Sequence, residues 1–202
     1  MVLPLSTVMA LALQCGSAAP PTTLTAIARA ESGFDPLAIG VNGIHARRLH
    51  PTSAADAVLA ARQLIAAGES VDLGLAQINA RNLAWLGLSV DDAFDPCANL
   101  AASARVFSQA YDRATQAGAA PATAQRTALS YYNTGSPRRG FTNGYVAKVL
   151  AAVPRAEAGL SPGLRYAADP PPPPAPSWDV FAHGARPDDG FVFSPQPTGD
   201  TP

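Results

Sequence analysis

The apolar residues of the first 155 positions recur with the spacing of an α-helix. Leu100, Ala104 and Phe107, for example, form one stripe along a single helix face, and Asn99 stands where a helix cap would be needed. No strand meander or internal repeat is visible, so we expect a mainly α fold with at most a small β-hairpin near residues 70–78. The predicted helices lie within residues 22–33, 53–67, 99–118, 121–133 and 142–153.

The apolar N-terminal segment "MVLPLSTVMALALQCG" leaves two interpretations open. It resembles a secretory leader in length, but the first cationic residue of the chain is Arg29, so the usual positive start of a leader is missing. The apolar run is also too short to span a bilayer. The segment is therefore either a leader or a helix of the mature domain.

The C-terminal part of the chain is rich in proline. Residues 170–174 are five consecutive prolines, and few aliphatic residues follow Ser161. Such a composition cannot bury enough apolar surface to offset the entropy lost on ordering, and the proline run is typical of a stiff polyproline II spacer. We expect a folded domain over residues 1–155 and a disordered Pro-rich tail over 156–202.

Aromatic residues in this tail suggest a docking motif for a partner protein, although a few aromatics without a role are the alternative. They are Trp178, Phe181, Phe191 and Phe193.

Charge excludes some classes of partner. The chain has 14 Lys and Arg against 15 Asp and Glu, and no basic stripe, so nucleic acid is not expected as a partner. No stretch is long and apolar enough for a transmembrane segment. His45 and His50 lack the spacing of metal ligands, so we expect them at the surface and predict neither metal nor cofactor.

The chain has two cysteines, Cys15 and Cys97. They are either buried free thiols or a disulfide that closes a long loop. In the chain-entropy model such a disulfide contributes on the order of 4 kcal/mol, and it implies an oxidising compartment.

One glutamate is placed as a candidate general acid. Leu24, Ile27, Ala28 and Glu31 recur at helical spacing, which puts Glu31 on the apolar face in the last turn of its helix. Partial burial and the negative end of the helix dipole both disfavour the ionised carboxylate. The two effects raise the pKa toward the neutral range that a general acid needs. The alternative is a glutamate at a frayed end that bends into solvent.

Other polar side chains accompany this carboxyl group. "VDLGLAQIN" supplies Asp72, Gln77 and Asn79, and "ALSYYNTG" supplies Tyr132 and Asn133 at a helix end. Amide, hydroxyl and carboxyl groups beside aromatic rings are typical of a sugar-binding surface. Each group alone is equally consistent with caps and packing.

Together these segments resemble the lysozyme-like lytic transglycosylases, specifically the VirB1-type proteins of type IV secretion systems. "ESGFDPLAIG" is similar to the catalytic Glu-Ser motif of that family, "GLAQIN" to its Gly-Leu-x-Gln motif and "ALSYYNTG" to its Ala-x-x-Tyr-Asn-x-Gly motif. The order agrees, and the likeness covers about residues 3–153. It implies a lysozyme-like, SLT-type domain in the periplasm.

The resemblance also implies a reaction and roles for named residues. Glycan strands of peptidoglycan would be cleaved between MurNAc and GlcNAc without water, because the C6 hydroxyl of the muramoyl residue attacks its own C1. Glu31 would be the acid and base, and Ser32 would support it. Gln77, Asn79, Tyr132 and Asn133 would shape the sugar site, with Tyr132 bonding the Glu31 carboxyl or the substrate.

Asp72 keeps a second mechanism open. "VDLGLAQIN" also resembles a segment of animal c-type lysozymes, in which the aspartate is a second catalytic carboxylate. A hydrolytic muramidase that uses Glu31 and Asp72 is therefore an alternative, as is a glycan-binding assembly factor without activity. The segment 40–70 is expected either to form a flap over the site or to cover core.

Overall fold

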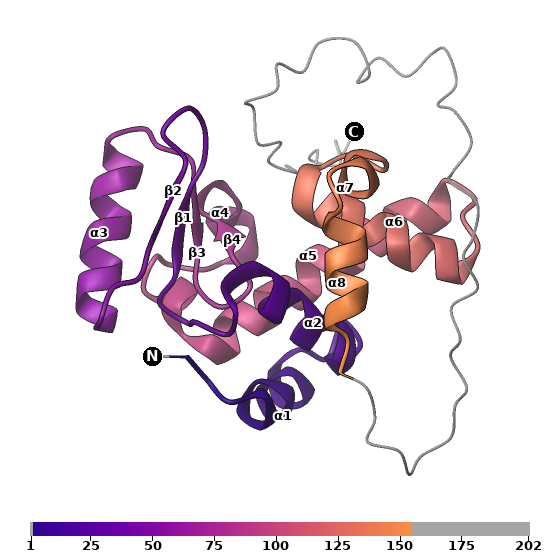
Figure 1. Cartoon of the computed structure of the whole chain (residues 1–202), viewed down its shortest axis with the longest axis horizontal. Helices are drawn as coiled ribbons and strands as arrows, with labels where there is room; N and C mark the ends of the chain where they lie inside the picture. Colours follow the sequence, from indigo (N-terminus) through magenta and orange to yellow (C-terminus); the bar gives the residue numbers. More distant parts are fainter. Residues whose placement is uncertain (1, 155–202) are drawn as a thin grey trace, which may run out of the picture.

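The structure is a computed structural model that describes residues 2–154 (Figure 1). Its helices are α1 (Leu5–Cys15), α2 (Pro21–Ser32), α3 (Ala54–Ala66), α4 (Leu83–Leu86), α5 (Pro96–Gln116), α6 (Pro121–Thr134), α7 (Arg139–Thr142) and α8 (Tyr145–Ala152). Its strands are β1 (Ile39–Val41), β2 (Arg47–Leu49), β3 (Val71–Leu73) and β4 (Ile78–Asn79), and the short 3-10 turns are η1 (Ala80–Asn82) and η2 (Asp92–Phe94). The mainly α prediction is confirmed. The Pro-rich tail and its aromatic residues lie outside the described residues.

Helix α5 lies at the centre of the helical part. It packs against α6 and α1, and α2 packs against α1 and α8. Phe107 is buried among residues of α2, α6 and α8, whereas Leu100 is buried beside α1 and α2. The helix begins at Pro96, and its N-cap is Asp95, whose side chain accepts from the Ala98 amide. Asn99 is therefore not the cap that the sequence suggested, because the helix starts one turn earlier.

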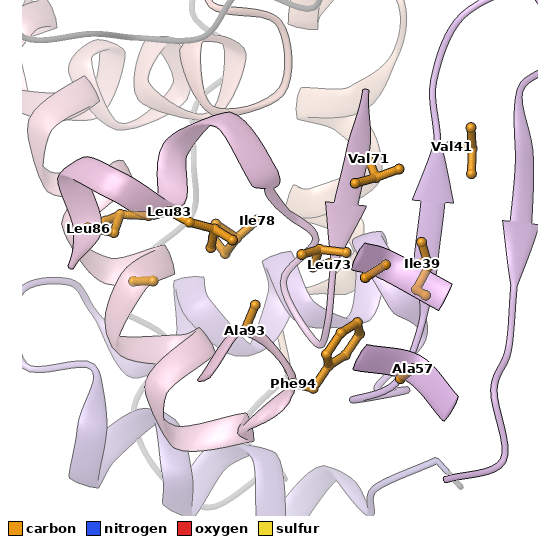
Figure 2. Packing of buried hydrophobic residues seen from close by; sticks show 12 residues of the cluster. Ile39, Val41, Ala57, Val71, Leu73, Ile78, Leu83, Leu86, Ala93 and Phe94 are labelled. Carbon is orange, nitrogen blue, oxygen red and sulfur yellow. The ribbon is translucent and has the colours of Figure 1, made fainter. Parts of the chain in front are cut away.

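A four-stranded antiparallel sheet with the order β2-β1-β3-β4 forms the other part of the molecule. Strands β3 and β4 are the expected hairpin, and β1 and β2 extend it. Because side chains alternate along a strand, one face carries apolar residues and the other carries polar ones. Figure 2 shows the apolar face, where Ile39, Val71 and Leu73 pack beside Phe94.

Of the two roles considered for the segment 40–70, the structure supports the covering of core. Helix α3 covers core, since Ala57 and Ala61 are fully buried in the cluster behind the sheet. Strand β2 is an edge strand, and it carries Arg48 to the polar face. His45 and His50 are exposed, and His50 Nδ1 lies 2.8 Å from the carboxylate Oδ2 of Asp35.

The N-terminal segment is part of this fold. Val8 and Ala12 of α1 are fully buried against α2 and α5. A disulfide between Cys15 and Cys97 joins the end of α1 to the first turn of α5. Within residues 2–154, no helix has the length and hydropathy of a membrane span.

Candidate active site

Glu31 lies in the last turn of α2, half-buried between the helical part and the sheet. Loss of hydration on burial raises the pKa of its carboxyl group to about 7, and the nearby Asp72 carboxylate adds to this shift. A hydrogen bond from Tyr145 and the charges of Lys148 and Arg48 act in the opposite direction. The carboxyl group therefore holds a proton at mildly acidic pH and loses it near neutrality, which suits an acid that must later act as a base.

Tyr145 is the direct partner of this carboxyl group. Its hydroxyl donates to Glu31 Oε1 over 2.6 Å. The sequence suggested Tyr132 for a bond to Glu31 or to the substrate, but the Tyr132 hydroxyl lies 3.0 Å from Ser103 Oγ and donates to the Ala76 carbonyl over 2.9 Å. Burial raises the pKa of both phenols, so both remain donors.

Asn133 acts on the site through Tyr145. Its side chain is exposed, and its Oδ1 accepts from Asn143 Nδ2 over 2.9 Å. Asn143 Oδ1 in turn accepts from the Tyr145 amide over 3.0 Å, at the start of α8. Asn133 at the end of α6 thereby helps to fix where α8 begins.

Two cations bind the C-terminal end of α2. Arg48 Nη1 donates to the Glu31 carbonyl over 2.5 Å, and Lys148 Nζ donates to the Ala30 carbonyl. Both side chains are exposed. Cations at this position satisfy carbonyls that the helix leaves open and complement its dipole.

Asp72 lies on β3, and an asparagine amide donates to each of its oxygens. Asn79 Nδ2 is 2.7 Å from Oδ1, and Asn42 Nδ2 is 2.8 Å from Oδ2. Burial raises the pKa of this carboxyl group, while the two amides and the Arg48 charge oppose the shift. The two amides fix the orientation of the carboxylate toward the polar face of the sheet.

The turn 74–77 between β3 and β4 is held by side chains from three helices. Ser32 of α2 donates to the Leu75 carbonyl over 2.6 Å, and Tyr132 of α6 donates to the Ala76 carbonyl. Asn99 of α5 is fully buried; its Oδ1 accepts from the Ala76 amide and its Nδ2 donates to two further carbonyls. These bonds fix the turn relative to Glu31, which precedes Ser32.

The backbone of this turn requires specific residues. Gly74 has a φ of 75°, and a Cβ there would lie 2.2 Å from the Ala93 carbonyl oxygen, so only glycine fits. Gln77 has a φ of 51°, and its Nε2 donates to the carbonyls of Gly74 and Ala38. The side-chain amide of Gln77 thus stabilises the turn, and its Oε1 lies close to Gly40.

Within residues 2–154, no group of three His, Cys, Asp or Glu side chains is arranged to hold a metal ion. The groups around Glu31 and Asp72 are carboxyl, amide, hydroxyl and guanidinium groups.

A family model described as "Transglycosylase SLT domain" matches residues 9–153. The chain belongs to the transglycosylase SLT family. The lysozyme-like fold class and the resemblance noted from the three motifs are both confirmed.

Curated SLT relatives are similar over the same part of the chain. "Protein virB1" of Agrobacterium fabrum is 40% identical over 141 residues, which cover 70% of this chain and 57% of that protein. "Protein virB1" of Rhizobium radiobacter is 41% identical over 141 residues, covering 70% and 58%. "Type IV secretion system protein virB1" of Brucella abortus biovar 1 is 38% identical over 150 residues, covering 71% and 63%.

The chain thus spans about 57–63% of the length of these relatives. No solved structure matches it significantly.

The structure places the expected site residues of the SLT domain in two sets. Glu31, Asp72 and Asn79 lie together, since Asp72 acts on the Glu31 pKa and Asn79 bonds Asp72. Ser32, Gln77, Tyr132 and Asn133 instead hold backbone or a neighbouring helix, as described above. The sequence motifs do not include Tyr145, Asn42 and Arg48, although these residues bond Glu31 or Asp72.

Proposed function

We propose that the protein is a lytic transglycosylase that cleaves the β-1,4 bond between MurNAc and GlcNAc in peptidoglycan and leaves a 1,6-anhydro product. The observation that carries this proposal is Glu31, a carboxyl group with a pKa of about 7 that accepts a hydrogen bond from Tyr145 in a chain of the SLT family. A single group that titrates near neutrality is suited to give up a proton and then recover one.

The proposed reaction uses Glu31 twice. The protonated carboxyl group gives its proton to the glycosidic oxygen, so the bond from C1 of the muramoyl residue to that oxygen breaks and GlcNAc leaves with a free C4 hydroxyl. The resulting carboxylate then takes the proton of the muramoyl C6 hydroxyl while O6 bonds to C1. The sum consumes no water, and Glu31 ends protonated as it began.

Tyr145 and Asp72 have supporting roles in this proposal. Tyr145 donates to Glu31 Oε1, which fixes the orientation of the acid and lowers its pKa toward neutrality. Asp72, oriented by Asn42 and Asn79, places negative charge near the oxocarbenium-like transition state without bonding to C1. Hydrolysis with Asp72 as nucleophile is the competing outcome.

Mass spectrometry of the products tests the reaction. Purified sacculi are digested with the full chain, and the released muropeptides are weighed. We expect anhydro products, each lighter by one water than the corresponding hydrolysis product, and none from the Glu31→Gln variant. Reducing-end products of the hydrolytic mass would overturn the proposal and make the protein a muramidase.

We further propose that the protein acts in the periplasm and opens the wall for a type IV secretion or conjugation apparatus. The names of the Brucella relatives and the disulfide between Cys15 and Cys97 support this role, since disulfides persist in oxidising compartments. Components of that apparatus would be recruited through the tail. Complementation of a secretion-deficient strain by the Glu31→Gln variant would instead favour a non-enzymatic assembly factor.

A further inference from the structure

The polar face of the sheet carries one row of cross-strand neighbours. Arg48 pairs with Gly40, Gly40 pairs with Asp72, and Asp72 pairs with Asn79. Residues paired across an antiparallel sheet project to the same face, so Arg48 shares a face with the Asp72 carboxylate. Gly40, between them, adds no side chain to this row.

The side-chain amide of Gln77 lies close to Gly40. A Cβ on Gly40 would lie 2.8 Å from Gln77 Oε1 and 3.6 Å from Asp72 Cβ. Glycine at this position therefore lets the Gln77 amide approach β1 next to Asp72. No side chain on β1 separates Arg48 from Asp72 in the row. This agrees with the finding that the Arg48 charge lowers the pKa of the Asp72 carboxyl group.

Arg48 is exposed, and one hydrogen bond to the Glu31 carbonyl holds it in place. That bond uses one of the five N–H donors of a guanidinium group. Arg48 belongs neither to the ion pair of His50 with Asp35 nor to that of Arg62 with Asp91. Arg48 thus lies exposed on the edge strand, bonded to the backbone of the proposed acid.

The substrate of the proposed reaction carries a carboxylate near its reacting carbon. The muramoyl residue must have its C1 at Glu31, and its 3-O substituent is a lactyl group whose carboxyl is either free or amide-bonded to a stem peptide that itself carries carboxylates. GlcNAc has no such group. A planar guanidinium fork matches a carboxylate better than any other side chain does.

We propose that Arg48 binds the carboxylate of the muramoyl 3-O substituent and thereby selects a muramoyl residue, rather than GlcNAc, for the position whose C1 meets Glu31. This inference rests on the proposed function, because it takes the bond broken to be the one at the muramoyl C1. It assigns Arg48 the recognition of substrate, beyond the support it gives to the end of α2.

Lys148 provides a matched control. It is also an exposed cation that donates to a carbonyl in the last turn of α2, and it also lowers the pKa of Glu31. It does not lie on the sheet and so is outside the row. If Arg48 served only to complement the helix end, the Arg48→Gln and Lys148→Gln variants would have the same effects.

Binding measurements on the full chain in the Glu31→Gln background test the inference. Calorimetry is done with three probes: glycan strands stripped of peptide, which have free lactyl carboxylates; strands with stem peptides; and neutral chitotetraose. We expect Arg48→Gln to weaken binding of at least one carboxylate-bearing probe by about tenfold or more, and of chitotetraose by less than twofold. Arg48→Lys should restore part of the lost affinity. Lys148→Gln should change the affinity neither for the carboxylate-bearing probes nor for chitotetraose.

The two carboxylate-bearing probes identify the source of the anion. A loss confined to stripped strands assigns Arg48 to the lactyl carboxylate, and a loss confined to peptide-bearing strands assigns it to the stem peptide. A second experiment tests recognition of the lactyl carboxylate. The free lactyl carboxyl of stripped strands is converted to its methyl amide, and the Arg48 side chain is left unchanged. The amide should then weaken binding as much as Arg48→Gln does, and the two changes together should add nothing further.

An equal loss for chitotetraose and the anionic probes, or the same pattern from Lys148→Gln, would overturn the inference. This failure is distinct from failure of the proposed function. Anhydro products from sacculi together with an Arg48→Gln variant of unchanged preference would refute only the role of Arg48, whereas hydrolytic products would refute only the reaction.

Discussion

Tyr145 and Glu31 are 114 positions apart in the chain, and the Tyr145 hydroxyl donates to Glu31 Oε1 over 2.6 Å. This bond stabilises the ionised form of the carboxyl group, whereas burial favours the protonated form. The pKa of about 7 is therefore a balance between two opposed effects of the same fold.

The first prediction concerns that balance. Tyr145→Phe removes the bond that lowers the Glu31 pKa, so the descending alkaline limb of the kcat/KM profile should move to higher pH. Activity should fall about tenfold or more because the carboxyl group loses its orientation. Tyr132→Phe is the control, since its hydroxyl does not bond Glu31; an identical profile for Tyr145→Phe and wild type would contradict the role of the bond.

Glu31→Gln should abolish cleavage of sacculi and leave the domain folded, because an amide has the shape of the acid but cannot give and recover a proton. The stability of the wild-type protein should also depend on pH. The carboxyl group titrates near 4.5 in the unfolded chain and near 7 in the folded one, so between these values the folded state binds more protons. The free energy of unfolding of wild type consequently falls as pH rises through this interval.

Relative to wild type, the Glu31→Gln variant should therefore gain stability between about pH 4 and pH 8. The gain in free energy of unfolding is at most about 3 kcal/mol, and screening by solvent at this half-buried side chain reduces it. Urea unfolding at both pH values measures it. Equal stability differences at the two values would show that Glu31 titrates as in the unfolded chain.

Asp72→Asn should reduce the rate modestly, by less than about 10²-fold, with anhydro sugar still the product. The physical reason is that the muramoyl C6 hydroxyl, and not Asp72, attacks C1 in the proposed reaction. Single-turnover rates and product masses give both readouts. A dead variant, together with hydrolytic products from wild type, would identify Asp72 as the nucleophile.

The disulfide should contribute on the order of 4 kcal/mol to stability, because it closes a loop of 82 residues in the unfolded chain. Cys15→Ser with Cys97→Ser should lower the urea midpoint accordingly, and unreduced protein should show no thiol that reacts with a maleimide after denaturation. Two reactive thiols in protein isolated from the periplasm would contradict the pairing under physiological conditions.

Truncation after about residue 160 should leave cleavage of sacculi within about twofold of the full chain, since every group of the site described above lies within residues 30–148. The same truncation should impair secretion in a complementation assay if the tail recruits partners. A large loss of cleavage would show that the tail completes the site.

The sequence was sufficient to predict the groups whose signals are local. The position of Glu31 follows from the spacing of Leu24, Ile27 and Ala28, and the helix of α6 follows from Pro121 and the apolar pattern after it. The β3–β4 hairpin was also expected, whereas β1 and β2 were not, and none of the four strands is longer than three residues, which is too few to show a clear alternating pattern.

The partners of the carboxyl groups were not predictable in the same way. Tyr145, Arg48 and Asn42 lie in different elements, and each reaches its partner through tertiary packing that no local pattern encodes. Tyr132 is expected from its motif to bond Glu31 or the substrate, but its hydroxyl donates to the Ala76 carbonyl and lies within hydrogen-bond distance of Ser103.

The turn 74–77 also has a consequence for when the protein becomes active. Ser32, Asn99 and Tyr132 come from three helices whose contacts with the turn span 43, 23 and 56 residues of chain. Until α2, α5 and α6 have all docked, the three side-chain contacts that hold the turn cannot all form. A nascent or partly unfolded molecule therefore lacks the assembled site, so the proposed wall-cleaving activity requires all three helices to be in place.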